Sequence, residues 1–175
     1  MHRSRIAMVL SLCTLMAGGC VTASPNSVPA PRVAVVGGGG PATQFGTSAT
    51  QVFDNPTLRP KIRTLFGPDW TSTSVSGLSA PIPAYFTQSS APKQLRIDGA
   101  DWIAVNGCMP QDCATRHGLL LIGPGGDRLL ARIDDGGFTR EYGYGPGMVT
   151  LQPRDRAVVD AAWNALRVNT AEVTG

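Results

Sequence analysis

The fold is decided by a short stretch in which four residues separate two cysteines: Asn106-Gly107-Cys108-Met109-Pro110-Gln111-Asp112-Cys113. A strand-like run over residues 102–105 precedes it, and a second apolar run over 118–122 follows it. This arrangement predicts a disulfide-closed loop between two strands of a sheet. So small a closed loop gains roughly 2 kcal/mol at most from chain entropy, so the bridge fixes a shape more than it stabilises a fold. The sequence indicates a rigid probe presented to a partner, since a loop shaped in advance loses less freedom on binding.

Further strands are expected on both sides of this loop. Leu95 and Ile97 alternate with polar residues, and Asp98-Gly99 is a hairpin signal. After the loop, apolar residues alternate again over 129–133, and residues 138–144 form another candidate strand. Because the turns between these strands are short, the strands should form an antiparallel meander.

Helices are expected at both ends of the meander. A short helix near Thr57–Phe66 has Asp54 and Asn55 as N-cap candidates. The proline-rich segment 80–86 is expected to be extended. A second helix, from Pro153 to about residue 168, has apolar residues at helical spacing and should pack on one face of the sheet. The predicted fold class is α+β, an antiparallel meander with a short N-terminal helix and a C-terminal helix packed on it, over residues 51–175.

The chain begins like an exported protein. A basic segment, Met1–Arg5, is followed by an apolar run over 6–16, which is shorter than the roughly 20 residues that span a bilayer. Small residues then precede Cys20, which resembles a bacterial lipoprotein signal peptide. That resemblance implies that residues 1–19 are removed and that Cys20 is lipidated. Ala17 stands where leucine is usual in such signals, so ordinary cleavage near residues 17–23 stays open.

The segment after the signal is predicted to be a flexible tether over residues 20–50, because it is rich in Pro, Ser, Thr, Ala and Gly. Val21 follows the lipidation site, and by resemblance to known lipoproteins this favours the outer membrane over the inner one. Loss of Arg3 and Arg5 with the signal lowers the basic count from 15 to 13 against 12 acidic residues, a net charge of about +1. With so little positive charge, nucleic acid is not an expected partner.

Few residues offer catalytic chemistry. Without the signal, His117 is the single histidine, and Asp134-Asp135 precede two glycines and are predicted to form a solvated turn. We therefore expect neither an enzyme nor a cofactor. A metal site of Cys108, Cys113 and His117, with Asp112 as a fourth ligand, is an alternative, because thiolates and imidazole bind soft metals. An exported pair of cysteines more often forms a disulfide.

At the cysteine loop the sequence resembles the inhibitor of vertebrate lysozyme family, often called Ivy. That family carries a Cys-Lys-Pro-His-Asp-Cys loop at the end of a strand, and here the two cysteines, Pro110 and Asp112 match. The surroundings are similar as well, with an Ile-Pro-Ala-Tyr segment at 82–85, an Asp-Gly turn, strands into and out of the loop, and a closing helix. The resemblance covers roughly Thr57 to Val168.

The resemblance implies a periplasmic protein that blocks lysozyme, or another peptidoglycan-cleaving enzyme, by inserting the loop into its active-site cleft. The binding residues would be Met109, Pro110, Gln111 and Asp112. Gln111 stands where the family has histidine, and Met109 where it has lysine. An amide donates hydrogen bonds but carries no charge opposite a carboxylate. This departure favours the alternative of a non-inhibitory envelope-binding lipoprotein on the same fold. The oligomeric state is open, with a homodimer among the options.

Overall fold

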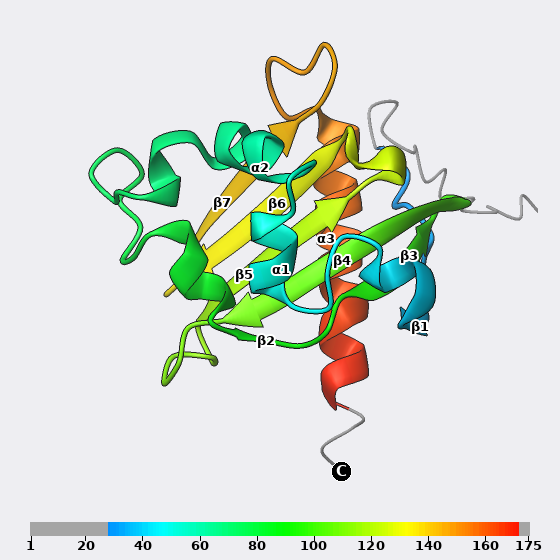
Figure 1. Cartoon of the computed structure of the whole chain (residues 1–175), viewed down its shortest axis with the longest axis horizontal. Coiled ribbons are helices and arrows are strands. Elements are labelled where there is room, and N and C mark those ends of the chain that lie inside the picture. The colour runs from blue at the N-terminus through cyan, green and yellow to red at the C-terminus, as the bar shows by residue number, and fades with distance from the viewer. Residues whose placement is uncertain (1–27, 172–175) are drawn as a thin grey trace, which may run out of the picture.

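The structure is a computed structural model that describes residues 28–171. These residues form one seven-stranded antiparallel sheet, in the order β1-β3-β4-β5-β6-β7, with the two-residue β2 paired to β4 (Figure 1). The strands are β1 (Val33–Gly38), β2 (Gln88–Ser89), β3 (Lys93–Ile97), β4 (Ala100–Cys108), β5 (Arg116–Ile122), β6 (Leu129–Asp135) and β7 (Phe138–Tyr144). The predicted meander from β3 to β7 is confirmed.

Helices cover both faces of the sheet. Figure 1 shows α3 behind the sheet, and α1 and α2 in front of it. The α-helices are α1 (Ala49–Asp54), α2 (Arg59–Phe66) and α3 (Pro153–Ala171), and the 3-10 helices are η1 (Gly40–Thr43), η2 (Gly67–Trp70), η3 (Ile82–Phe86) and η4 (Pro124–Gly126). The predicted α+β class, with a short N-terminal helix and a C-terminal helix packed on an antiparallel sheet, is confirmed.

Side-chain alternation along the strands builds two apolar cores. In β4, Trp102 and Ala104 face α3, while Ile103 and Val105 face the layer of α1, α2 and η3. This follows from the strand period of two, which sends neighbouring side chains to opposite faces. Both faces of the central strands are therefore buried, and the cysteine loop joins two of these strands, β4 and β5.

The turn that leads into β4 has the backbone predicted from its sequence. Asp98 and Gly99 have φ values of 48° and 85°, which a two-residue hairpin turn with two left-handed positions requires. Asp98 also accepts a hydrogen bond from the Arg32 N–H at 3.0 Å, so the turn fastens the start of β1.

The prediction of a tether over 20–50 is wrong for its second half. Residues 33–38 form β1, which pairs with β3, and η1 and the first turn of α1 follow. Val33 and Val35 pack against the α3 core. The folded domain therefore begins well before residue 51. Residues 20–27 of the predicted tether lie outside the described residues.

Two further local predictions need correction. Residues 82–86 form the 3-10 helix η3 rather than an extended segment, with proline in its first turn. The helix predicted near Thr57 begins at Arg59, and its N-cap position is Leu58. Asn55 acts just before it, because its side-chain oxygen accepts hydrogen bonds from the N–H groups of Thr57 and Leu58.

Candidate functional site

The loop between β4 and β5 projects from the end of the sheet (Figure 1). It is closed at its base by the predicted disulfide between Cys108 and Cys113, whose Cα atoms lie 5.0 Å apart. The backbone adds further closure. The Asp112 N–H donates to the Met109 carbonyl at 3.1 Å, and the Arg116 N–H donates to the Asp112 carbonyl at 2.9 Å. The loop therefore has a defined shape that does not depend on the sulfur bridge alone.

The four predicted binding residues divide into two exposed and two half-buried ones. Pro110 and Gln111 form the exposed tip. Met109 is half-buried and packs against the core beneath α2 and η3. Gln111 has a φ of 69°, in the left-handed region, which turns the chain sharply at the tip. A partner that meets the loop end-on would first contact Pro110 and Gln111.

Asp112 is engaged within the protein. Its carboxylate lies 2.6 Å from Nη1 of Arg116, and Nε of the same guanidinium lies 2.8 Å from the carboxylate of Asp135. Asp135 in turn accepts hydrogen bonds from the N–H of Ser79 at 2.6 Å and from its hydroxyl at 2.9 Å. This chain of contacts joins the loop to the end of β6 and to the segment before η3.

Asp135 is buried, with 8% of its surface exposed, so the predicted solvated turn is wrong for this residue. Burial acts to raise the pKa of Asp135, but the hydrogen bonds from Ser79 and Arg116 outweigh it and hold the pKa below its usual value. Burial, together with the nearby Asp135 carboxylate, raises the pKa of Tyr85 to about 12. At neutral pH the site therefore holds an ionised carboxylate beside a neutral phenol.

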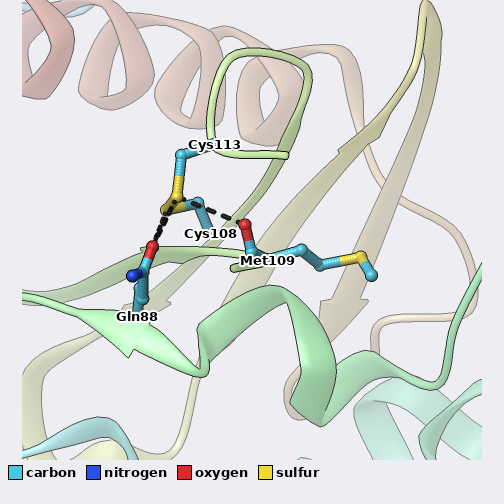
Figure 2. The surroundings of a disulfide bond; sticks show 4 residues. All are labelled: Gln88, Cys108, Met109 and Cys113. Carbon is cyan, nitrogen blue, oxygen red and sulfur yellow. Dashed lines mark hydrogen bonds between the residues drawn. A yellow bond between two sulfur atoms is a disulfide. The ribbon is translucent and has the colours of Figure 1, made fainter. Parts of the chain in front are cut away.

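The opposite side of the loop faces α3. Figure 2 shows the Gln88 side chain directed at the disulfide, while the Met109 side chain points away from it. Oε1 of Gln88 lies 2.9 Å from Sγ of Cys113. Because oxidised sulfur carries no proton, we describe this as a close oxygen–sulfur contact. The disulfide and Gln88 line a groove of about 470 Å³ that reaches Trp163 on α3.

His117 lies in this groove, opposite Cys108 in the register of β4 and β5. Its ring meets that of Trp163 edge-on, with centroids 5.8 Å apart. Burial, and then the positive charge of Arg167, lower the pKa of His117 below 6.5. A neutral imidazole suits a metal, but the sulfurs of Cys108 and Cys113 are bonded to each other. Within residues 28–171, no group of three or more potential ligand residues is placed to hold a metal ion.

Sequence reasoning missed Arg116, Asp135 and Ser79 as partners of the loop. Asp135 is one residue from a glycine turn, which is why its sequence context indicated solvent. The pairing of β5 with β6 places Arg116 opposite Asp135, and this register is the signal that the sequence carried. Ser79 lies 56 positions away along the chain from Asp135, and no local pattern connects the two.

The predicted lipidation site, Cys20, and the signal over residues 1–19 lie outside the described residues. In the part of the chain that is described, no helix is both long and apolar enough to cross a bilayer. Comparison with known protein families, with curated proteins and with solved structures found no match. The resemblance at the cysteine loop is therefore a hypothesis that rests on this chain's own residues.

Proposed function

We propose that this protein is a periplasmic lysozyme inhibitor, held at the outer membrane by lipidated Cys20, that inserts the loop 109–112 into the active-site cleft. One observation carries the proposal. The exposed tip, Pro110 and Gln111, stands on a disulfide-closed loop at the end of two buried strands. Such a tip projects from the sheet and is restrained at its base, which suits a ligand that enters a cleft. The chain's similarity to the Ivy loop gives the target.

Rigidity is what makes so small a contact sufficient. A binding loop that must be ordered on contact loses roughly 0.5–1.5 kcal/mol for each long side chain that becomes fixed. Here the disulfide, the hydrogen bonds within the loop and the proline at position 110 limit the loop before it meets a partner. Most of the contact energy is then available for binding.

The tip acts as a neutral hydrogen-bonding group. Lysozyme catalysis uses two carboxyl groups, one of them ionised. The Gln111 amide can donate to such a carboxylate, while the Asp112 carboxylate is turned toward Arg116 and adds little repulsion. Hydrogen bonds to a charged group contribute about 1.5–3 kcal/mol when the donor is well placed. Shape and amide hydrogen bonds replace the charge attraction that a histidine would give.

The test is the rate at which lysozymes of several classes clear a peptidoglycan suspension as the purified protein is added. Wild-type protein should slow at least one class. Gln111→Ala should weaken inhibition, and the double variant Cys108→Ser/Cys113→Ser should weaken it more by freeing the loop. Val149→Ala is the matched control, because Val149 is 94% exposed and lies between β7 and α3. It should inhibit like the wild type.

A second function is favoured by the neutrality of the tip. Among residues 109–112 the single ionisable side chain, Asp112, is already paired with Arg116. Such a tip also suits an uncharged component of the cell envelope, and the protein would then be an envelope-binding lipoprotein without inhibitory activity. If wild-type protein leaves every lysozyme unaffected, and sediments with peptidoglycan through a contact that Gln111→Ala abolishes, this second function replaces the first.

A further inference from the structure

The loop is tied down on both faces of the sheet. Cys108 and Cys113 lie on the α3 face, where they line the groove with Trp163. The contacts of Arg116 lie on the opposite face, because Asp135 follows Ile133 at the strand period of two and Ile133 packs in the core beneath α2. We infer that Arg116 is the positioning residue of the loop, and that its two ion pairs fix the direction in which the tip leaves the sheet.

The disulfide fixes the distance between Cys108 and Cys113, but a loop held at one point can still tilt about that point. The ion pairs of Arg116 oppose this tilt. Arg116 forms ion pairs with Asp112 of the loop at 2.6 Å and with Asp135 on β6 at 2.8 Å, so the loop is joined to β6 as well as to β5.

Asp135, the residue to which this second contact is attached, is buried and hydrogen-bonded. The side chain of Asp135 is 4% exposed, and Ser79 holds both of its oxygens at 2.6–2.9 Å. A further bond, from the Gly136 N–H to the Thr115 carbonyl at 3.1 Å, joins the turn after β6 to the loop. Arg116 therefore connects the loop at Asp112 to a buried carboxylate of the sheet, which limits how the loop can tilt.

Asp112 was expected to bind the partner, but its carboxylate joins the loop to the sheet through Arg116. Its replacement should therefore alter the orientation of the tip and leave the chemical groups of the tip unchanged. This inference rests on the proposed function wherever inhibition is measured. The geometry of the tie can be tested without a partner.

The experiment is hydrogen exchange of the backbone amides in the full chain, followed by inhibition assays on the same proteins. In Asp112→Asn and Arg116→Lys, the amides of residues 112, 115 and 116 should exchange about tenfold faster, as expected when a charged hydrogen bond is lost. Amides of the β5 core, Leu119–Leu121, should exchange at the wild-type rate, because the sheet itself is intact. A general loss of stability would accelerate both sets.

Asp101→Asn is the matched control, since it breaks an exposed ion pair with Arg96 at the far end of β4. It should leave loop exchange unchanged. Combining Asp112→Asn with Cys108→Ser/Cys113→Ser should accelerate loop exchange by more than the product of the separate effects, because both faces are then released. Unchanged loop exchange in Asp112→Asn and Arg116→Lys would overturn the inference.

Inhibition separates this inference from the proposed function. If wild-type protein inhibits a lysozyme, Asp112→Asn should raise the inhibition constant several-fold, mainly through faster dissociation. Faster loop exchange with an unchanged inhibition constant would overturn the positioning role. If wild-type protein inhibits no lysozyme, the proposed function fails, while the exchange rates still decide whether Arg116 fixes the loop.

Discussion

Gln111 occupies the left-handed backbone region, with a φ of 69°. Glutamine is uncommon there, whereas asparagine, aspartate and histidine are several-fold enriched among non-glycine residues. The backbone at the tip would therefore accept the histidine that the resembled family carries. This makes position 111 a place where charge can be added with little change in loop shape.

We predict that Gln111→His tightens lysozyme inhibition about fivefold at pH 5.5, because a charged donor to a carboxylate is stronger than a neutral one by roughly 1 kcal/mol. The gain should fade above pH 7, since free histidine has a pKa near 6.5 and its imidazole loses the charge. Inhibition constants at several pH values measure this. Gln111→Asn is the control, because it suits the same backbone without a charge. An equal gain at pH 8 would argue against the charge.

Asp135 links stability to pH. Its pKa is lowered in the folded protein, so its contribution is complete above the ordinary value of 3.8 and is lost as the pH falls through the lowered value. We predict that Asp135→Asn lowers the free energy of unfolding by roughly 2 kcal/mol at pH 7, and that this difference shrinks below pH 3.8. Urea unfolding at both pH values measures the two differences.

The control is Asp127→Asn, because the Asp127 side chain is 73% exposed in its pair with Lys61. An exposed ion pair contributes about 0–1 kcal/mol, so this variant should unfold much like the wild type. A deficit in Asp135→Asn that persists unchanged at acid pH would show that lost packing, rather than lost ionisation, is responsible.

At the residue scale, whether a contact could be predicted from the sequence depended on how many positions separate its two residues along the chain. The Cys108–Cys113 disulfide was predictable because five positions separate the partners and the N-terminal sequence led us to expect an exported chain, in which such a pair closes. The contact between Arg116 and Asp135 needed the β5–β6 register, and that between Ser79 and Asp135 needed the tertiary fold. Residues that support the loop were therefore missed, while residues within it were found.

At the scale of elements, β1 lies at the edge of the sheet and completes the α3 core. It pairs with β3 from Val33↔Ile97 to Gly38↔Lys93. We predict that a chain starting at residue 28 unfolds like the full chain, whereas one starting at residue 40 loses roughly 2–3 kcal/mol, because burial of Val33 and Val35 is lost. Urea unfolding and light scattering measure the effect. The shorter chain should also aggregate, since β3 becomes a bare edge.

The failure to predict β1 and η3 has a physical cause. β1 follows several prolines, is rich in valine and ends in the first two of four consecutive glycines, so composition pointed to a tether although pairing with β3 supplies the order. η3 is set by close packing. A Cβ on Gly107 would lie 2.8 Å from Phe86 Cα, and one on Gly118 would lie 2.6 Å from the Phe86 ring. Because these two positions are glycine, η3 can pack closely against the sheet. The local preferences of residues 82–86 give no sign of this packing.

At the scale of the whole molecule, the chain enters the domain at one end of β4 and presents the loop at the other. Arg32 bonds to Asp98 beside the turn before β4, and Cys108 ends that strand eight residues after its first residue, Ala100. At about 3.3 Å per residue the two ends lie roughly 27 Å apart. The start of the described chain and the loop therefore lie at opposite ends of β4.

This arrangement bears on the proposed lipidation of Cys20. We predict that Cys20→Ala moves the protein from the membrane fraction to the soluble periplasm or blocks its maturation, and that released mature protein still inhibits in solution with an unchanged constant. The reason is that the loop lies at the far end of β4 from the turn bonded to Arg32, so a change ahead of residue 28 should leave the loop unaltered. Fractionation and the lysis assay measure the two outcomes.

Coupling the mature protein to vesicles through the Cys20 thiol should likewise leave inhibition intact. Loss of inhibition on coupling would mean that the loop faces the bilayer, and membrane association that persists in Cys20→Ala would place the anchor elsewhere.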